Sequence, residues 1–400
     1  MNAKNQFKQK LSPRLCVSAV KKLFKTIIHF YPAIVFLLAI SCNNPSGQLD
    51  IIPLEPTQNE KPAPGKPTQI IKLETTPESQ LGYIDKTAFD TEYNRIFVLS
   101  DFTVFIFDNN GKFISKLKKG RGPGEVSMII AFSLNKQKQL FYALDNSNRI
   151  CVFDYSGKMQ NDYQLDGFYG KDIQVIDDNN VFLLNIKVFD CEPYFAGIYN
   201  FEKKQIIQRF IPREESPYPE LMMIVNNSFT SVNERKFFST TNIFGLFEFK
   251  EGDFQKVISY DLGNRKVPES LIQKTMESGR RARFGEEAQK NNYVPYLLNS
   301  FYHKGHFWAI IDDEERSCYA ISEKNRNKVY LRGPVSSYFN LPNVYSFGLP
   351  KEINQDYLVF AGHPTDFFDE NTTSEKTTIE IGNQKLEIEL GENPFLVVVE

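Results

Sequence analysis

The stretch Val104–Leu117, VFIFDNNGKFISKL, decides the fold, because its pattern returns in Ile150–Met159, ICVFDYSGKM. Each stretch has an apolar run, an aspartate, a two-residue turn, a glycine and a lysine, which is typical of a β-hairpin. Gly111 and Gly157 are 46 residues apart. Self-similarity at a period of about 20 to 50 residues indicates an architecture built from repeats.

Three weaker copies continue the repeat, with turns near Lys203, Gly252 and Asn325. Each hairpin is preceded by further apolar runs, so that every repeat has four short strands. These runs are apolar at successive positions, which is expected of strands that are buried on both faces. Four short strands in a fixed period predict the blade of a β-propeller rather than part of a sandwich.

The two ends of the chain are expected to share one blade. Tyr357–Ala361 and Phe395–Val399 supply two strands of a sixth repeat, which lacks an outer strand. Gln69–Leu73 is apolar and otherwise unpaired, so we expect it to complete that blade and close the ring. The sequence therefore predicts an all-β fold over residues 68–400, a six-bladed β-propeller with four-stranded blades closed by an N-terminal strand.

Two insertions interrupt the repeats. Residues 267–292 separate blades four and five. Pro268 marks a helix start and the stretch after it is rich in helix formers, so they predict a short helical insertion. Residues 364–394 interrupt the last blade and contain an extra hairpin turned at Gly382. The first insertion carries Arg280, Arg281 and Arg283, which either lie on a solvated helix or contact a partner.

The N-terminus has the features of an export signal. Residues 1–41 contain seven basic residues and no acidic one, and Ile27–Ser41 is an apolar run too short for a membrane-spanning helix of roughly 20 residues. The cysteine that follows, Cys42, resembles that of a bacterial lipobox, although Ala39 stands where leucine is commonest. This resemblance implies a lipoprotein signal peptide over residues 1–41 and acylation of Cys42; the alternative is an uncleaved membrane anchor.

Residues 42–67 are rich in proline and predict an extended tether. About 25 residues at roughly 3.1 Å each could reach on the order of 75 Å. The chain beyond residue 41 has 40 basic residues against 49 acidic ones. That balance excludes a nonspecific nucleic-acid binder, because phosphate contacts need clustered cations.

Three cysteines remain outside the signal region, Cys151, Cys191 and Cys318. Each lies in or beside an apolar run. We expect small buried side chains, the alternative being one disulfide with a free thiol.

Two motifs resemble known propeller families. Leu144–Lys158, LDNSNRICVFDYSGK, resembles the NHL repeat, and Gly120–Glu125, GRGPGE, is similar to a motif of the six-bladed β-propeller lipoproteins of Bacteroidetes, as is the segment Phe249–Pro268. The resemblance implies a propeller in the bacterial cell envelope. It carries over no catalytic residue.

Candidate binding residues are few. The glycine run at Gly120–Glu125 leads into another strand rather than a helix, so it predicts an inter-blade crossover instead of a phosphate loop. If that loop binds a ligand, Arg121 and Glu125 are its functional side chains. Asp101 and Asp145 end the second strands of blades one and two, where an acid either lines the rim or terminates the strand.

The histidines of the mature chain are His303, His306 and His363. His303 and His306 could chelate a metal across a tight turn at Gly305, but no third ligand is indicated, so we expect neither a metal nor a cofactor. No linear catalytic motif is present, although propeller enzymes gather catalytic residues from several blades.

These features favour a membrane-tethered, non-catalytic binding or scaffolding propeller of the cell envelope, monomeric, on the periplasmic or cell-surface side. Its expected partners are the membrane, through the lipid anchor, and an envelope protein or glycan. The alternative is a hydrolase or lyase acting on a glycan or lactone at the channel mouth. A third possibility is a sensor that contacts a membrane receptor through residues 267–292.

Overall fold

The computed structural model describes residues 50–57, 65–185, 193–221, 227–330, 333–368 and 375–400. The predicted signal peptide, Cys42 and Cys191 lie outside these residues. Within them, no helix has the length and apolar character needed to cross a membrane.

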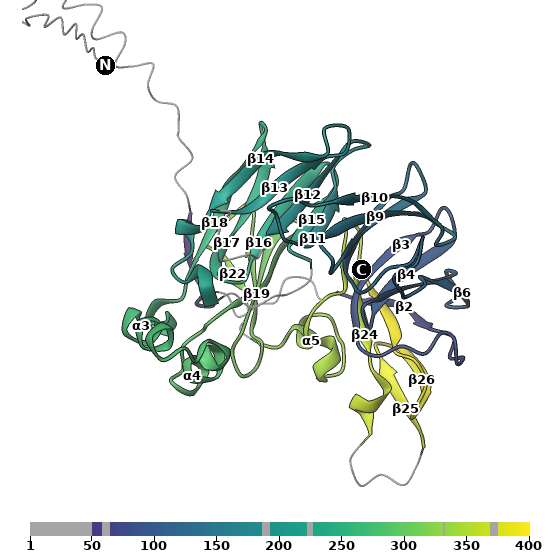
Figure 1. Cartoon of the computed structure of the whole chain (residues 1–400). Helices are drawn as coiled ribbons and strands as arrows, with labels where there is room; N and C mark the ends of the chain where they lie inside the picture. Colours follow the sequence, from purple (N-terminus) through teal and green to yellow (C-terminus); the bar gives the residue numbers. More distant parts are fainter. Residues whose placement is uncertain (1–49, 58–64, 186–192, 222–226, 331–332, 369–374) are drawn as a thin grey trace, which may run out of the picture. The chain divides into compact units, whose positions relative to one another are not determined.

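The first five blades each consist of four antiparallel strands that follow one another in the chain (Figure 1). The first strand of each blade is the inner one, and inner strands of neighbouring blades contact one another. The strands of these blades are β3 (Ile84–Asp90), β4 (Arg95–Ser100), β5 (Thr103–Phe107) and β6 (Phe113–Lys116); β7 (Ile129–Asn135), β8 (Leu140–Asp145), β9 (Arg149–Asp154) and β10 (Met159–Gln164); β11 (Gly170–Val175), β12 (Asn180–Asn185), β13 (Tyr194–Asn200) and β14 (Gln205–Pro212); β15 (Phe229–Val232), β16 (Arg235–Thr240), β17 (Ile243–Lys250) and β18 (Asp253–Asp261); β19 (Leu297–His303), β20 (His306–Ile311), β21 (Cys318–Ser322) and β22 (Val329–Tyr330).

The sixth blade contains both ends of the chain. Its strands, from the inside outward, are β23 (Glu352–Ile353), β24 (Leu358–Gly362), β27 (Phe395–Val399) and β2 (Pro67–Lys72). The closing strand β2 pairs antiparallel with β27, with Ile70 opposite Val397. The six-bladed propeller closed by an N-terminal strand is therefore confirmed.

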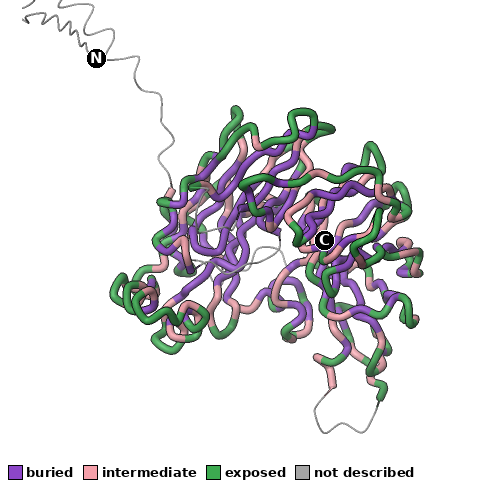
Figure 2. Tube along the Cα trace, in the orientation of Figure 1, coloured by how far each residue is buried: buried purple, intermediate pink, exposed green. Residues whose placement is uncertain are grey.

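Apolar side chains fill the seams between blades. Six clusters of buried residues lie one at each of the six contacts between neighbouring blades, and the last joins Ile96 and Val98 of the first blade to Val359 and Leu396 of the sixth. Figure 2 shows the buried residues running along the strands, with exposed residues in the loops. Both faces of a central strand are covered, which explains runs that are apolar at successive positions.

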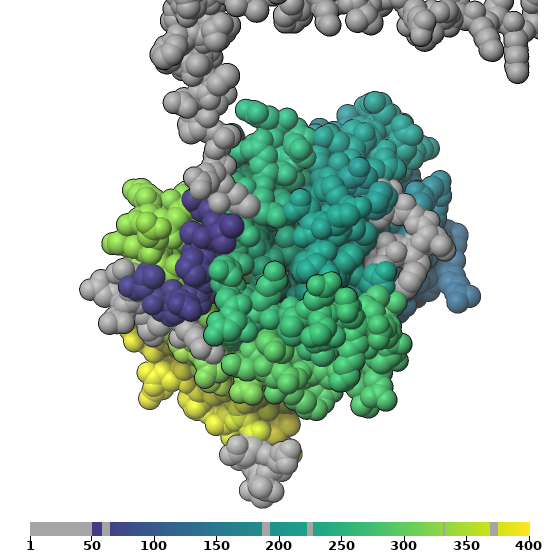
Figure 3. All heavy atoms as spheres, turned by 90° about the vertical axis from the view of Figure 1, so that its left-hand side faces the viewer, coloured from purple at the N-terminus to yellow at the C-terminus, as the bar shows by residue number. Residues whose placement is uncertain are grey.

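The segment predicted as a free tether is partly bound to the propeller, which corrects that prediction for residues 50–57 and 65–67. Strand β1 (Ile51–Pro53) pairs parallel with β18, so the fourth blade has five strands rather than four. Ile52 and Leu54 are buried in the seam between blades four and five. Their apolar side chains favour docking over exposure to water. We call residues 50–57 the strap; its purple atoms lie against the surface of the propeller in Figure 3.

The strap also bonds to the fifth blade. The Thr57 backbone N–H donates to the Val329 carbonyl at 3.0 Å, and the Arg326 guanidinium pairs with Asp50 at 2.6 Å. The Lys66 and Glu400 backbones exchange hydrogen bonds at 2.8 and 3.0 Å just before β2. The N-terminal segment thus contacts the outer strands of blades four and five and supplies the outer strand of blade six.

The helical insertion between blades four and five is confirmed as α3 (Glu269–Ser278) and α4 (Phe284–Lys290). Tyr218, Phe284 and Tyr296 are among the side chains of a small apolar cluster that attaches it to the propeller. The insertion in the last blade contains the hairpin β25 (Lys376–Ile381) and β26 (Gln384–Glu389). The remaining helical turns are η1 (Arg213–Glu215), η2 (Pro219–Leu221), η3 (Gly263–Arg265), η4 (Arg281–Arg283), α5 (Val335–Tyr338), η5 (Tyr345–Gly348) and η6 (Pro364–Phe367).

Candidate functional site

A cavity of about 240 Å³ lies where the first, fifth and sixth blades meet, beside the starts of the inner strands β3 and β19. We call it the mouth cavity. It is slightly smaller than the range of about 300 to 1,000 Å³ that is common for ligand pockets, so it suits a ligand of one ring. Its lining residues are Tyr83, Ile84, Leu298, Arg316, Tyr345, Ser346, Leu349, Lys351, Ala361, His363 and Pro394.

Three aromatic rings form part of this cavity. Tyr83 and Tyr345 are 53% and 68% exposed, whereas most aromatic rings of the propeller are buried in the seams between blades. His363 stacks on Tyr83 with ring centroids 4.6 Å apart, and the two tyrosines meet edge to face at 6.5 Å. The His363 Nδ1 lies 2.7 Å from the Thr365 hydroxyl. Burial lowers the pKa of His363, and the negative charge of Asp366 opposes this shift.

Two cations line the same cavity. The Arg316 guanidinium lies 4.1 Å from the centre of the Tyr345 ring. The Arg316 side chain runs directly past Gly348, where a Cβ would lie 2.6 Å from an Arg316 nitrogen, so a larger residue at position 348 would displace it. Lys351 is partly buried next to β23, and its backbone N–H donates to the Val359 carbonyl at 2.7 Å. Burial lowers the pKa of the Lys351 ammonium; Asp85 opposes this shift and Arg316 adds to it. No lining residue of this cavity is an aspartate or glutamate.

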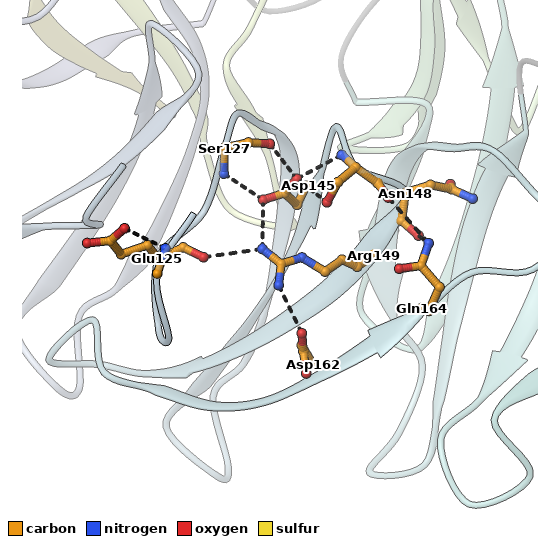
Figure 4. A network of polar contacts seen from close by, with 9 residues as sticks. Glu125, Ser127, Asp145, Asn148, Arg149, Asp162 and Gln164 are labelled. Atoms are coloured by element: carbon orange, nitrogen blue, oxygen red, sulfur yellow. Dashed lines mark hydrogen bonds and ion pairs between the residues drawn. The ribbon is translucent and has the colours of Figure 1, made fainter. Parts of the chain in front are cut away.

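Asp145, a predicted candidate, is buried and its carboxylate is occupied (Figure 4). It accepts hydrogen bonds from the backbone N–H and the hydroxyl of both Ser127 and Ser147, at 2.7 to 2.8 Å. Burial alone would raise its pKa, but these hydrogen bonds lower the pKa to about 2. The carboxylate therefore holds the loop in place and has no free oxygen for a ligand.

The two motifs that resemble propeller families bind each other. Arg149 donates to Asp145 at 3.3 Å, to Asp162 at 2.9 Å and to the Glu125 backbone carbonyl at 3.2 Å (Figure 4). The Gly120–Glu125 loop is thus tied to the second blade by that blade's own arginine. This accounts for the motifs as structural elements of the fold.

The remaining candidates of the first blade stay predictions. The Glu125 carboxylate accepts the Gly122 N–H at 2.8 Å inside its own loop, which is an inter-blade crossover as expected, and Arg121 is exposed. Asp101 follows β4 with a positive φ of 48° and is exposed. None of the three lines the mouth cavity.

The histidines do not converge. His303 and His306 face each other across the β19–β20 turn, but their Nδ1 atoms each lie 3.0 Å from a backbone carbonyl, that of Asn354 and that of Lys304. Burial lowers the pKa of His303 to about 4, against the hydrogen bond to Asn354. Only His363 lines the mouth cavity. Across the described ranges, no three His, Cys, Asp or Glu side chains come together as a metal site.

The arginines of the helical insertion lie at its surface. Arg281 pairs with Glu220 at 3.0 Å, whereas Arg280 and Arg283 are exposed. A partner contact through these residues stays a prediction. Cys151 and Cys318 are buried free thiols, in agreement with the expectation for these two.

Acidic side chains in the channel join inner strands together. Asp172 binds Lys86 at 3.1 Å and accepts the Ser228 backbone N–H at 2.8 Å. Burial raises the pKa of Glu352 to about 7, but its carboxylate accepts the Phe89 N–H at 3.0 Å and the Tyr357 hydroxyl at 3.3 Å. These contacts connect separate blades, which is a structural role.

Sequence reasoning missed Tyr83, Arg316, Tyr345 and Lys351. They come from connecting segments at three places in the chain, so no linear spacing joins them. Arg316 directly follows an acidic stretch, residues 312–315, which the sequence predicts to be a solvated turn. The only hint in the sequence was that isolated aromatic residues occur in predicted loops. Such residues do not indicate which loops come together in the folded protein.

The chain belongs to the family described as "Domain of unknown function (DUF4934)", whose pattern matches residues 64–400. No curated protein matches the sequence. Among solved structures, the chain is similar to a protein of Bacteroides fragilis NCTC 9343 described as a "Putative exported protein". The two share 14% identity at a TM-score of 0.65, over 88% of this chain and 99% of that one.

Weaker likenesses are to a luciferin-regenerating enzyme and to the C-terminal WD40 domain of Sif2. The first has 12% identity and a TM-score of 0.42 over 82% of this chain and 94% of that one. The second has 13% identity and a TM-score of 0.38 over 70% and 72%. At these identities the comparisons show the propeller fold alone.

Proposed function

We propose that this chain is an exported, lipid-anchored propeller of the bacterial cell envelope that binds a ligand in the mouth cavity without catalysis. The observation that carries the binding role is the pair of exposed rings, Tyr83 and Tyr345, beside a cavity at the junction of three blades. Exposed aromatic rings in a concave site are typical of ligand recognition. The similarity to an exported protein of Bacteroides fragilis supports the envelope location.

The hydrolase or lyase alternative is not favoured. Glycoside hydrolysis uses a pair of carboxylates beside the scissile bond. The lining of the mouth cavity contains no carboxylate, and the described acids Asp172 and Glu352 of the channel bind backbone or side-chain partners within the propeller.

Binding is tested by melting the full chain, purified in detergent, with a panel of glycans and metabolites. We expect at least one compound to raise the melting temperature, and the double variant Tyr83→Ala, Tyr345→Ala to lose that shift. Tyr93→Ala, which removes an exposed ring in the turn at the opposite end of β3 from Tyr83, is the matched control. A panel without any stabilising compound, or turnover of the bound compound, would contradict the proposal.

The anchor is tested separately by cell fractionation. The wild-type chain should remain with the membranes, and Cys42→Ser should release it or leave it unprocessed. A Cys42→Ser variant that is membrane-bound and processed like the wild type would overturn lipid anchoring.

A further inference from the structure

The two cations of the mouth cavity form no ion pair within the described part of the chain. Among the described residues, no carboxylate lies within ion-pair distance of the Arg316 guanidinium or the Lys351 ammonium. By contrast, Arg265 and Arg326 each pair with an aspartate, Asp313 and Asp50 respectively. Two unpaired positive charges in one partly buried cavity create a positive potential that favours an anion.

The acids nearby in the chain are bound elsewhere. The Asp313 carboxylate binds Arg265 at 2.6 Å and the Ser317 N–H at 2.7 Å. The Asp366 carboxylate accepts the Ser346 N–H at 2.9 Å. Asp85 and Asp312 act on Lys351 and Arg316 through space, but neither forms an ion pair with them, and burial raises the pKa of both carboxyls. The hydrogen-bonding groups of the two cations are therefore open to a ligand.

The aromatic rings of the cavity indicate what the uncharged part of the ligand is. Arg316 lies against the Tyr345 ring, and His363 stacks on the Tyr83 ring, so the cavity presents aromatic surface beside a cation. An aromatic face packs well against another flat or weakly polar ring. Arginine binds a carboxylate in a fork of two parallel hydrogen bonds. A ligand that satisfies both requirements has a ring and a carboxylate.

We infer that the mouth cavity binds a ring-shaped carboxylic acid, with the carboxylate between Arg316 and Lys351 and the ring against Tyr83 and Tyr345. This inference rests on the proposed binding function and gives it a ligand class. Two sources share this chemistry, a uronic acid residue of a glycan and an aromatic acid. The cavity volume of about 240 Å³ admits one such ring.

The test is calorimetric titration of the full chain in detergent with galacturonic acid, glucuronic acid and benzoate. Galactose and glucose, which lack the carboxylate, are the neutral comparisons. We expect an acid to bind at least tenfold more tightly than its neutral counterpart. Binding of uronic acids alone identifies a glycan source, and binding of benzoate alone identifies an aromatic acid.

Matched variants assign the binding to the cavity. Arg316→Met and Lys351→Met should each weaken acid binding at least tenfold while leaving the melting temperature of the free protein within a few degrees. Lys118→Met removes an exposed cation outside the lining and should leave binding unchanged. Tyr83→Ala should weaken both acids and neutral sugars.

Two results would overturn the inference. One is equal affinity for the neutral sugars and the acids, and the other is unchanged acid binding in Arg316→Met and Lys351→Met. If a neutral compound from the wider panel binds and these acids do not, this inference fails while the proposed function stands. If no compound of either kind binds, both fail.

Discussion

At the scale of single residues, Asp145 shows how a carboxylate at a strand end can hold a blade to its neighbouring loop. Its oxygens accept hydrogen bonds from Ser127, Ser147 and Arg149, and its side chain is fully buried. Removing one partner leaves the others buried and unsatisfied. Asp145→Ala should therefore lower the free energy of unfolding by about 2 to 4 kcal/mol.

Urea denaturation of the purified chain measures this loss. Asp162→Ala is the control, because Asp162 binds the same arginine at 2.9 Å but is half exposed. A surface ion pair contributes about 0 to 1 kcal/mol. Equal losses in the two variants would contradict the role assigned to Asp145.

His303 makes stability depend on pH. Its pKa falls from an ordinary value of 6.5 to about 4 in the folded protein, chiefly because burial penalises the charged ring. As pH falls below 6.5, the unfolded chain takes up this proton before the folded one does. The folded state should lose about 2 kcal/mol from this residue between pH 7.5 and pH 5.

The measurement is the unfolding free energy in urea at both pH values. His303→Asn retains a donor for the Asn354 carbonyl and should reduce the difference between them. A wild-type slope in His303→Asn would show that another group is responsible.

At the scale of elements, the closing strand explains why two glycines of the same repeat motif differ. Gly111 and Gly157 both have a positive φ, 82° and 85°. A Cβ on Gly111 would lie 2.0 Å from the Lys72 carbonyl at the end of β2, whereas the nearest atom to one on Gly157 is 3.6 Å away. The Glu74 N–H also donates to the Gly111 carbonyl at 2.8 Å.

Gly157→Ala should therefore cost about 1 kcal/mol, from the positive φ alone. Gly111→Ala should cost about 3 kcal/mol or more, because the methyl group would push the closing strand away. Thermal denaturation of the two variants makes the comparison. Equal costs would show that the contact between β2 and the first-blade turn contributes little.

The strap offers a second matched pair. Ile52 is buried in the seam between blades four and five, and its neighbour Ile51 is 65% exposed. Ile52→Ala should destabilise the protein by about 2 to 4 kcal/mol. Ile51→Ala should stay within about 0.5 kcal/mol of the wild type.

Denaturant midpoints of both variants, together with the rate of proteolytic cleavage near residue 50, measure strap docking. A free tether, as the proline content suggested, would make the two substitutions equivalent. A bound strap is supported only if Ile52→Ala lowers the denaturant midpoint clearly more than Ile51→Ala does.

Elements with strong local patterns could be predicted from the sequence, and elements defined by their partners could not. The hairpins around Gly111 and Gly157 carry their own turn signals. Residues 267–292 exceed the length of the repeat and are rich in helix formers, which predicted the helices. Strand β23 has two residues and β1 has three, so neither has a period of its own. The mouth cavity was missed for a related reason, because Tyr83, Arg316 and Lys351 come together only when the first, fifth and sixth blades meet.

At the scale of the whole molecule, closure should make unfolding a single event. An open array of repeats can lose its terminal repeats first, because each end has one free interface. Here the sixth blade contacts both the fifth and the first, so every blade is held by two seams. No blade can leave without exposing two apolar surfaces.

Two probes in different seams test this. Trp308, the single tryptophan of the chain, is buried between blades five and six, and Cys151 is buried between blades one and two. In a variant with Cys151 as its only thiol, tryptophan fluorescence and thiol labelling should give the same urea midpoint. Gly111→Ala, which weakens the contact with the closing strand, should shift both midpoints together. Separate midpoints would mean that the blades unfold as independent units and that the pairing of β2 with β27 does not couple the ends of the chain.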